Sequence, residues 1–496
     1  MTQAPAVAPS VAPGEQFIRG IGPLQAISLV VGSMIGSGIF IVSAGIGREV
    51  AAWGPGGLML VWLVTGLMTL AGALSYAELA AMMPKAGGQY VFLREGLSPM
   101  AGFLYGWTLF TVIQTGTIAA VAVAFAKFMG VFFPAISDTI TLSLGSIRLP
   151  GAPDAIPLGL SAQRLVAIAS ILLLTAINYR GVKQGAGVQT VLTVAKVGAL
   201  AALVVLGLTA FRQPAVAAAN FGEFWGTAPW TLAMVPVIGA AMVGSLFSSD
   251  AWNNVTFAAA EVRNPSRNLP LALASGTALV TVLYLLANLS YLSVLPFAGD
   301  PAGTTALARG IQHAAQDRVG TAAVEVMLGP GGGAVMALAI IISTFGCNAG
   351  LILAAPRVYY AMARDRLFFE RAGHLHSRYR TPAFGLAAQA VWASALCLSG
   401  TYNQLLDYVI FAALVFYLLT TVALFRLRRL QPDTPRPVRA FAYPVVPALY
   451  IAAIAVLLVV LLVQKPLYTW PGLVIVALGV PVYYVWRRSA AGTGGA

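Results

Sequence analysis

Twelve apolar stretches dominate this sequence, and they restrict the chain to one class of fold. A helix needs ~20 mostly apolar residues to cross the hydrocarbon core of a bilayer. The stretches lie at residues 24–46, 56–83, 100–133, 162–179, 187–211, 230–260, 268–296, 330–363, 382–400, 403–426, 441–463 and 470–486. Since 59% of the residues are hydrophobic and only 9% are charged, the chain could not cover a soluble surface. We therefore predict an all-α integral membrane protein with 12 transmembrane helices.

The net charge of +13 is distributed unevenly between the two sides of the predicted spans. If the N-terminus is cytoplasmic, 20 Lys and Arg residues lie in cytoplasmic segments and seven lie in outer segments. The remaining two, Lys127 and Lys196, fall inside spans. Because basic residues collect on the cytoplasmic side of membrane proteins, both termini are predicted to be cytoplasmic. The charge thus reports topology and contact with membrane lipid, and we expect no nucleic-acid partner.

Residues that usually perform catalysis or bind metals are scarce. Cys347 and Cys397 both fall in predicted spans, and the three histidines fall in loops. This pattern supports neither a disulfide framework nor a structural metal site. We expect no enzyme activity, no catalytic residues, no metal and no cofactor. The first sixteen residues lack the features of a signal peptide, so residues 1–22 are predicted to be a disordered cytoplasmic tail.

Two of the predicted spans are interrupted by flexible or polar residues. Met34 to Phe40 places a Gly-Ser-Gly sequence in the middle of the first span, where each glycine costs ~1 kcal/mol relative to alanine. Phe247 to Asn254 places a carboxyl group and several small polar residues in the sixth span. Backbone that is not helical survives at membrane depth only where it lines a cavity or is buried in protein. A pair of interrupted spans in corresponding halves of a chain indicates the substrate site of a secondary transporter.

The motifs in and around these breaks resemble those of the amino acid, polyamine and organocation transporter superfamily, most closely its L-type amino acid transporter branch. The similar segments are Gly32–Phe40, Ser75–Glu78, Gly87–Tyr90, Val182–Lys196, Phe247–Asn253 and Asn264–Pro270. The resemblance implies a LeuT-like fold, with a 5+5 inverted repeat, broken helices 1 and 6, and two additional C-terminal helices. The expected parts are a tail at 1–22, repeats at 23–212 and 213–429, helices 11 and 12 at 430–488, and a C-terminal tail at 489–496.

The resemblance also implies how an amino acid zwitterion would be bound. Gly36, Ser37 and Gly38 match the family's cradle for the substrate carboxylate, where free N–H groups and the helix dipole attract an anion. The carbonyl groups of Met34 and Phe247 match positions that accept the substrate ammonium. The Phe247 ring resembles the family's gate, which closes the outer path over the ligand.

Asp250 and Asn253 in the second break leave several roles open. A carboxyl group buried in a membrane is expensive and is usually functional. Asp250 could be a counter-charge for the substrate ammonium, a protonatable coupling group, or an organiser of the unwound backbone. Asn253 could contact the substrate or tie the break together through its donor and acceptor atoms.

Lys196 lies too deep in the fifth span for easy extension to the membrane surface. The resemblance places it against spans 1 and 8, where sodium-coupled relatives hold a sodium ion. An ammonium group there would replace the ion, so we expect sodium-independent transport. The alternative is a lysine that reaches an interface, which is the interpretation we adopt for Lys127 near the outer end of the third span.

Other polar residues near the spans have simpler interpretations. Ser343 in span 8 could border the cavity, but polar groups between packed helices often bond only to one another. Glu78 and Glu261 near the inner face could form ion pairs of an inner gate or anchor helix ends, and we favour anchoring.

Light chains of heteromeric relatives are linked to a partner by a cysteine in the outer loop after span 3. Residues 134–161 contain no cysteine, so we expect no disulfide-linked heavy chain and a location in a prokaryotic-type cytoplasmic membrane. The oligomeric state stays open.

The predicted function is sodium-independent transport of neutral L-amino acids by alternating access, as exchange or proton symport. One alternative is transport of cationic amino acids or polyamines, if Asp250 is ionised. Another is a transporter-like amino acid sensor, although both tails are short for signalling.

Overall fold

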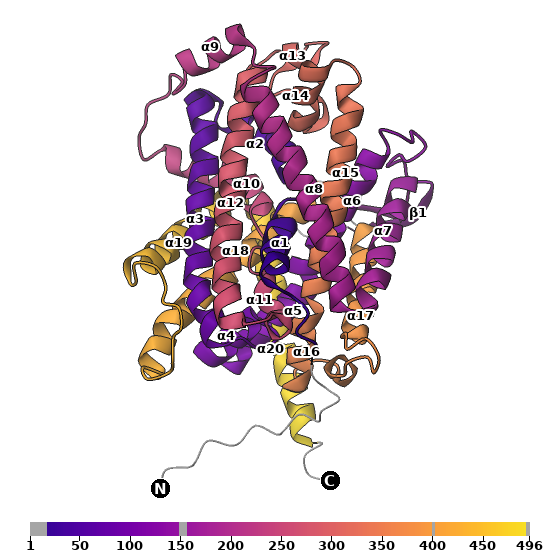
Figure 1. Ribbon diagram of the computed structural model, residues 1–496, viewed down its shortest axis with the longest axis vertical. Helices are drawn as coiled ribbons and strands as arrows, with labels where there is room; N and C mark the ends of the chain where they lie inside the picture. The colour runs from indigo at the N-terminus through magenta and orange to yellow at the C-terminus, as the bar shows by residue number, and fades with distance from the viewer. Residues whose placement is uncertain (1–16, 148–155, 399–401, 493–496) are drawn as a thin grey trace.

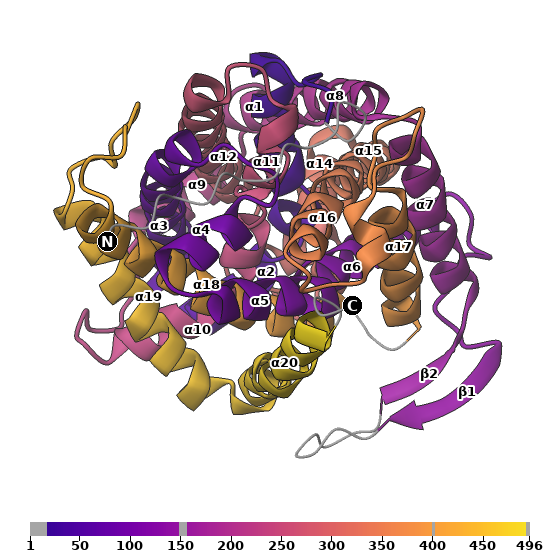
Figure 2. The same ribbon diagram turned by 90° about the horizontal axis from the view of Figure 1, so that it is seen from below.

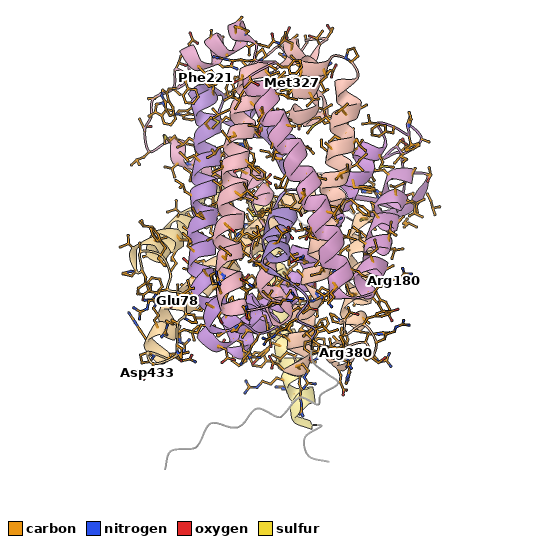
Figure 3. The ribbon with its side chains drawn as sticks, viewed as in Figure 1. Glu78, Arg180, Phe221, Met327, Arg380 and Asp433 are labelled. Atoms are coloured by element: carbon orange, nitrogen blue, oxygen red, sulfur yellow. The ribbon has the colours of Figure 1, made fainter. Side chains whose placement is uncertain are left out.

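The chain forms a bundle of long helices that run between two opposite faces (Figure 1). A computed structural model describes residues 17–147, 156–398 and 402–492. We call one end of the bundle the lower face and the other the upper face. Figure 3 marks the lower face by Glu78, Arg180, Arg380 and Asp433, and the upper face by Phe221 and Met327.

Helices account for almost all of the regular structure in these residues. In chain order they are α1 (Pro23–Met34), α2 (Ser43–Glu49), α3 (Gly54–Met82), α4 (Gln89–Gly96), α5 (Pro99–Thr108), α6 (Gln114–Met129), α7 (Ala162–Tyr179), α8 (Val182–Leu208), α9 (Pro214–Gly222), α10 (Met234–Ser248), α11 (Asn254–Phe257), α12 (Pro265–Val294), α13 (Ala306–Arg309), α14 (Val319–Leu328), α15 (Gly332–Ala354), α16 (Pro356–Arg364), α17 (Ala383–Cys397), α18 (Tyr402–Leu430), α19 (Val445–Gln464) and α20 (Pro466–Gly492). Short 3₁₀ turns occur between some of them, including η1 (Gly38–Phe40) directly after the first break.

Nine helical segments within the described ranges are long and apolar enough to cross a membrane. They are α3, α5 with α6, α7, α8, α12, α15 with α16, α18, α19 and α20. The shorter apolar helices α1, α10 and α17 lie at the predicted first, sixth and ninth spans. The prediction of a helical protein with many membrane spans is therefore confirmed.

Two further features of the long helices are an irregular turn in one of them and the position of the last two. A π-helical turn, Leu109–Ile113, joins α5 to α6, and the Thr115 hydroxyl donates to the Phe110 carbonyl at 2.7 Å beside it. The last two helices lie at the edge of the bundle, where α19 packs on α3 and α10 and α20 packs on α5 (Figure 2).

The loop after α6 contains an antiparallel strand pair that the sequence analysis did not predict. Strands β1 (Leu142–Ile147) and β2 (Ile156–Leu160) form a hairpin that extends beyond α7 and α17 (Figure 2). The Arg164 guanidinium donates to the carbonyls of Gly159, at 2.9 Å, and Leu398, at 2.7 Å, so it ties the hairpin to the end of α17. The fold is thus helical apart from this hairpin.

The chain before α1 packs against the lower face. Ile21 is fully buried, its N–H group donates to the Glu261 carbonyl at 3.0 Å, and its carbonyl accepts from Arg263 at 2.9 Å. Because both backbone groups are paired, residues 17–22 differ from the predicted disordered tail. Residues 1–16 of that tail lie outside the described ranges, and α20 runs past residue 488 into the predicted C-terminal tail.

Buried ion pairs join different helices at the lower face. Glu261 and Arg357 are each 1% exposed, and Arg357 Nε lies 2.7 Å from a carboxylate oxygen of Glu261. Glu78 accepts from Arg428 Nε at 2.9 Å and from the Ala440 N–H at 2.7 Å. Both acids therefore form ion pairs that connect separate segments at this face.

Candidate functional site

The two predicted breaks meet in the centre of the bundle. Helix α1 ends at Met34, and Ile35 takes an extended backbone conformation before η1 and α2 continue the span. Helix α10 ends at Ser248, and Ala251 has a φ of 65°, a left-handed conformation that side chains disfavour. A Cβ atom on Gly38 would lie 2.0 Å from Ser248 Oγ and 2.8 Å from its Cβ. The breaks touch here only because position 38 is glycine.

The carbonyl groups at the end of α1 receive hydrogen bonds from a buried lysine. Lys196 on α8 is 1% exposed, and its Nζ lies 2.7 Å from the carbonyl oxygens of both Gly32 and Ile35. It also lies 3.0 Å from the Ser343 carbonyl on α15. Among the described residues no carboxylate lies within 4.0 Å of Lys196. Its charge is therefore met by carbonyl dipoles at the negative end of a helix.

Hydroxyl and thiol groups from two other helices serve the remaining carbonyls of the first break. Ser343 Oγ lies 2.9 Å from the Gly36 carbonyl, and Cys347 Sγ lies 3.0 Å from the Ser33 carbonyl. Tyr284 on α12 has its hydroxyl 3.1 Å from the Met34 carbonyl and 2.9 Å from the Ser248 carbonyl. That hydroxyl therefore joins the two breaks directly.

The backbone N–H groups of the first break are paired less completely than its carbonyl groups. Gly36, Ser37 and Gly38 are all buried. The Phe40 N–H donates to the Ser37 carbonyl at 3.1 Å, but the N–H groups of Gly38 and Ile39 have no acceptor within the described part of the chain. Neighbouring buried N–H donors at the start of a helical turn suit an anionic oxygen.

The second break is organised around a carboxyl group and an amide. Asp250 is 8% exposed and accepts a hydrogen bond from the Tyr417 hydroxyl on α18. Asn253 Nδ2 donates to Gln89 Oε1 at 2.6 Å, and Gln89 Nε2 donates to Thr420 at 3.0 Å. The break is thus fastened to α4 and α18.

Space beside the breaks is small, whereas a larger cavity opens above them. Two cavities of about 20 and 10 Å³ border Asp250, and each is about the size for one water molecule. A cavity of about 580 Å³ lies between α6, α7 and the segment before α14, and Ile41 just beyond η1 lines it. Below the breaks, Ile21 pairs with the segment around Glu261. The chain around Ile21 thus lies below the breaks, and the large cavity lies beyond the end of η1 on their upper side.

The structure brings most of the predicted site residues to this centre. Met34, Gly36, Ser37 and Gly38 form the first break, and Phe247 occupies the last turn of the helix that ends against it. The Phe247 carbonyl accepts from the Asp250 N–H at 3.2 Å, and the Met34 carbonyl lies within hydrogen-bond distance of Tyr284. The Met34 carbonyl has a second lone pair for a ligand.

Sequence reasoning missed several residues that hold the site together. Tyr284 and Tyr417 are tyrosines in apolar spans, and such a tyrosine gives no sequence signal that separates packing from a contact with a break. Gln89 was visible as part of a motif but had no assigned role, because its partner is 164 residues away. Ser343 was interpreted as architectural, yet it bonds directly to the first break.

Comparisons with known proteins find similar sequences among amino acid transporters. The family described as "Amino acid permease" matches residues 21–485. The serine/threonine exchanger SteT of Bacillus subtilis is 31% identical over 95% of this chain and 98% of its own length. The mouse b(0,+)-type amino acid transporter 1 is 29% identical over 91% of this chain and 83% of its own. The human large neutral amino acids transporter small subunit 2 is 28% identical over 95% of this chain and 81% of its own length.

Proposed function

Because the chain belongs to the amino acid permease family, whose members are membrane transporters and not enzymes, we propose that it carries neutral L-amino acids by alternating access. It works without sodium, as an exchanger or a proton symporter. The observation that carries this proposal is the meeting of two interrupted helices at Gly38 and Ser248, inside a bundle with many membrane spans.

The zwitterionic backbone of the substrate would be held between the breaks. The unoccupied N–H groups of Gly38 and Ile39 support a role for Gly36–Gly38 as the carboxylate cradle. The Met34 and Phe247 carbonyls would take the ammonium, the Met34 carbonyl through its second lone pair. Phe247 would close the path between this centre and the upper cavity.

The proposed independence from sodium rests on Lys196. Its ammonium group contacts the carbonyls of Gly32, Ile35 and Ser343, a set of oxygen atoms of the kind that coordinates a cation. A fixed positive charge at this place leaves no need for a metal ion there. The exchange activity in the name of one bacterial relative favours exchange over symport.

Architecture and orientation complete the proposal. The chain would have 12 spans, with repeats at 23–212 and 213–429 and two further helices at 430–488. The lower face, which carries Arg180 and Arg380, would be the cytoplasmic side of a prokaryotic-type cytoplasmic membrane. The chain would work without a disulfide-linked heavy chain, since both cysteines are buried.

A second candidate substrate is a cationic amino acid. Within the described ranges, no lysine or arginine lies within 4.0 Å of Asp250, whose side chain accepts from a neutral tyrosine. An ionised Asp250 could therefore pair with a basic substrate side chain.

Uptake by reconstituted protein tests these proposals. Labelled neutral and cationic amino acids would be offered to proteoliposomes with and without internal substrate, with sodium or choline outside, and with or without a proton gradient. We expect uptake of neutral amino acids that internal substrate accelerates and sodium does not change. Binding without uptake of any substrate would favour a sensor and overturn the transport proposal.

A further inference from the structure

The upper cavity contains more positive than negative side chains in its wall. Lys127, Arg164 and Arg318 line it together with Asp138 and Asp317. These residues come from α6, α7, the hairpin loop and the segment that precedes α14. At about 580 Å³, the cavity is large enough for a small organic molecule.

Both acids in this wall already have partners. Asp138 lies 3.6 Å from Arg164, which also donates to two backbone carbonyls. Asp317 lies 2.7 Å from Arg48, at the edge of the cavity. The acids and Arg164 are thus used in holding the wall together.

Lys127 and Arg318 are the two basic residues of the cavity wall that take no part in these ion pairs. Within the described residues neither has a carboxylate within 4.0 Å. Arg318 stacks on the Phe128 ring at 5.0 Å, and its buried Nε has no hydrogen-bond partner in the same residues. Burial lowers the pKa of the Arg318 guanidinium, since nothing nearby compensates for its loss of water.

We propose that Lys127 and Arg318 form a binding site for the carboxylate group of a small molecule in the upper cavity, separate from the cradle at the breaks. A carboxylate would satisfy both cations at once, and arginine pairs with its planar oxygens through two parallel hydrogen bonds. Ile41, three residues from Gly38, lines the cavity, so the proposed site lies close to the first break in the chain. The proposal rests on the cavity and its charges and goes beyond the proposed transport function.

Protection of an introduced cysteine from a neutral maleimide tests this site. Ser137→Cys is a nearly isosteric change at an exposed position in the cavity wall, and the native Cys347 and Cys397 are buried. The reaction would be measured with propionate, with L-threonine, and with L-threoninol, which lacks the carboxylate. Propionate and L-threonine at twice their dissociation constants should slow labelling about threefold, the factor 1 + [L]/Kd. L-Threoninol should not slow it.

Charge-neutral variants decide whether the two cations cause the protection. Lys127→Gln and Arg318→Gln should each remove it, whereas Arg212→Gln, an exposed arginine in the loop between α8 and α9, should retain it. Protection by L-threonine alone, lost in both variants, also supports the site and identifies an amino acid as its ligand. Three results would overturn the proposal: protection that persists in both variants, protection by L-threoninol equal to that by L-threonine, and no protection by propionate or by L-threonine. Since propionate protection does not depend on uptake, failure of the transport proposal would leave this result unaffected.

Discussion

The two interrupted helices touch each other, but different kinds of groups stabilise them. At the end of α1 the carbonyl groups receive hydrogen bonds from a buried ammonium group on α8 and from hydroxyl and thiol groups on α12 and α15. At the end of α10 the ionisable group is Asp250, which belongs to the break itself and accepts from one tyrosine. The first break therefore depends on donors supplied by neighbouring helices, whereas the second contains its own carboxyl group. Changes to those donors should affect the first break most.

Removal of the Lys196 side chain should have the largest effect. Lys196→Ala leaves the buried Gly32 carbonyl without this donor, at a cost of about 1–3 kcal/mol, while the Ile35 carbonyl keeps the Ser343 hydroxyl at 3.1 Å. We expect loss of uptake in proteoliposomes and a lower unfolding temperature in detergent.

The matched control for this lysine is on the same helix. Lys183→Ala changes an exposed residue of α8 and should leave uptake near the parental rate. Two results would contradict the role of Lys196. One is uptake by the parent protein that increases when sodium is added, and the other is exchange by Lys196→Ala with the kinetics of the parent at every pH.

The contact between the breaks can be separated from the space for a ligand. Gly38→Ala should reduce stability by about 1–3 kcal/mol, the usual cost of overpacking, since its methyl group would collide with Ser248. Gly36→Ala is the control, because its Cβ would meet only Cys347, whose Sγ would lie 3.4 Å away and whose Cβ 3.9 Å away. Thermal unfolding would measure both variants.

A compensating change tests the same contact from the other side. Ser248→Gly removes the two side-chain atoms nearest to the added methyl, so it should restore part of the stability of Gly38→Ala. If Gly38→Ala is as stable as Gly36→Ala, the breaks are not packed as described.

Phe247 tests whether the second break also closes the path from above. Phe247→Ala should lower the uptake rate about tenfold, equivalent to about 1.4 kcal/mol in the barrier, while Phe247→Trp should retain part of the activity. Equilibrium binding should weaken less than uptake, because the ring would cover the ligand without holding its charges. Parental uptake by the alanine variant would place the gate elsewhere.

The smallest effect is expected at the donor to Asp250. Tyr417→Phe removes one hydrogen bond and should lower the free energy of unfolding by about 1 kcal/mol. In an Asp250→Ala background the same change should cost less, because the acceptor is already absent. An equal cost in both backgrounds would show that Tyr417 stabilises the protein by packing alone.

The sequence allowed the helical class and the positions of both breaks to be predicted, because these depend on local composition. Gly36–Gly38 and Asp250 stand out in apolar surroundings, and a break in a span is a property of its own residues. The partners of the breaks could not be found in this way. Tyr284 and Gln89 act through contacts across 250 and 164 positions of the chain, which only the packed helices define.

Two smaller differences have physical causes of the same kind. The strand pair β1–β2 was missed because its stability comes from pairing and from Arg164, which belongs to the next helix. The chain at Ile21 is ordered because the segment after α11 supplies both of its backbone partners. In each case a short segment with a weak local preference is fixed by a distant one.

The π-helical turn Leu109–Ile113 means that the two halves of its span are out of phase. An α-helix turns about 100° per residue, so one extra residue in a turn rotates everything above it by that angle. Tyr105 and Leu109 of the lower half, with Gln114 and Thr117 just above the turn, line the small cavity beside Asp250, and Val123 and Lys127 further along the upper half line the large cavity. Deleting one residue from this turn would restore a regular helix and swing Lys127 away from the upper cavity, while leaving the composition of the span nearly unchanged. A sequence alignment of this chain with a relative that places a one-residue gap in this turn therefore changes which residues are assigned to the small and large cavities.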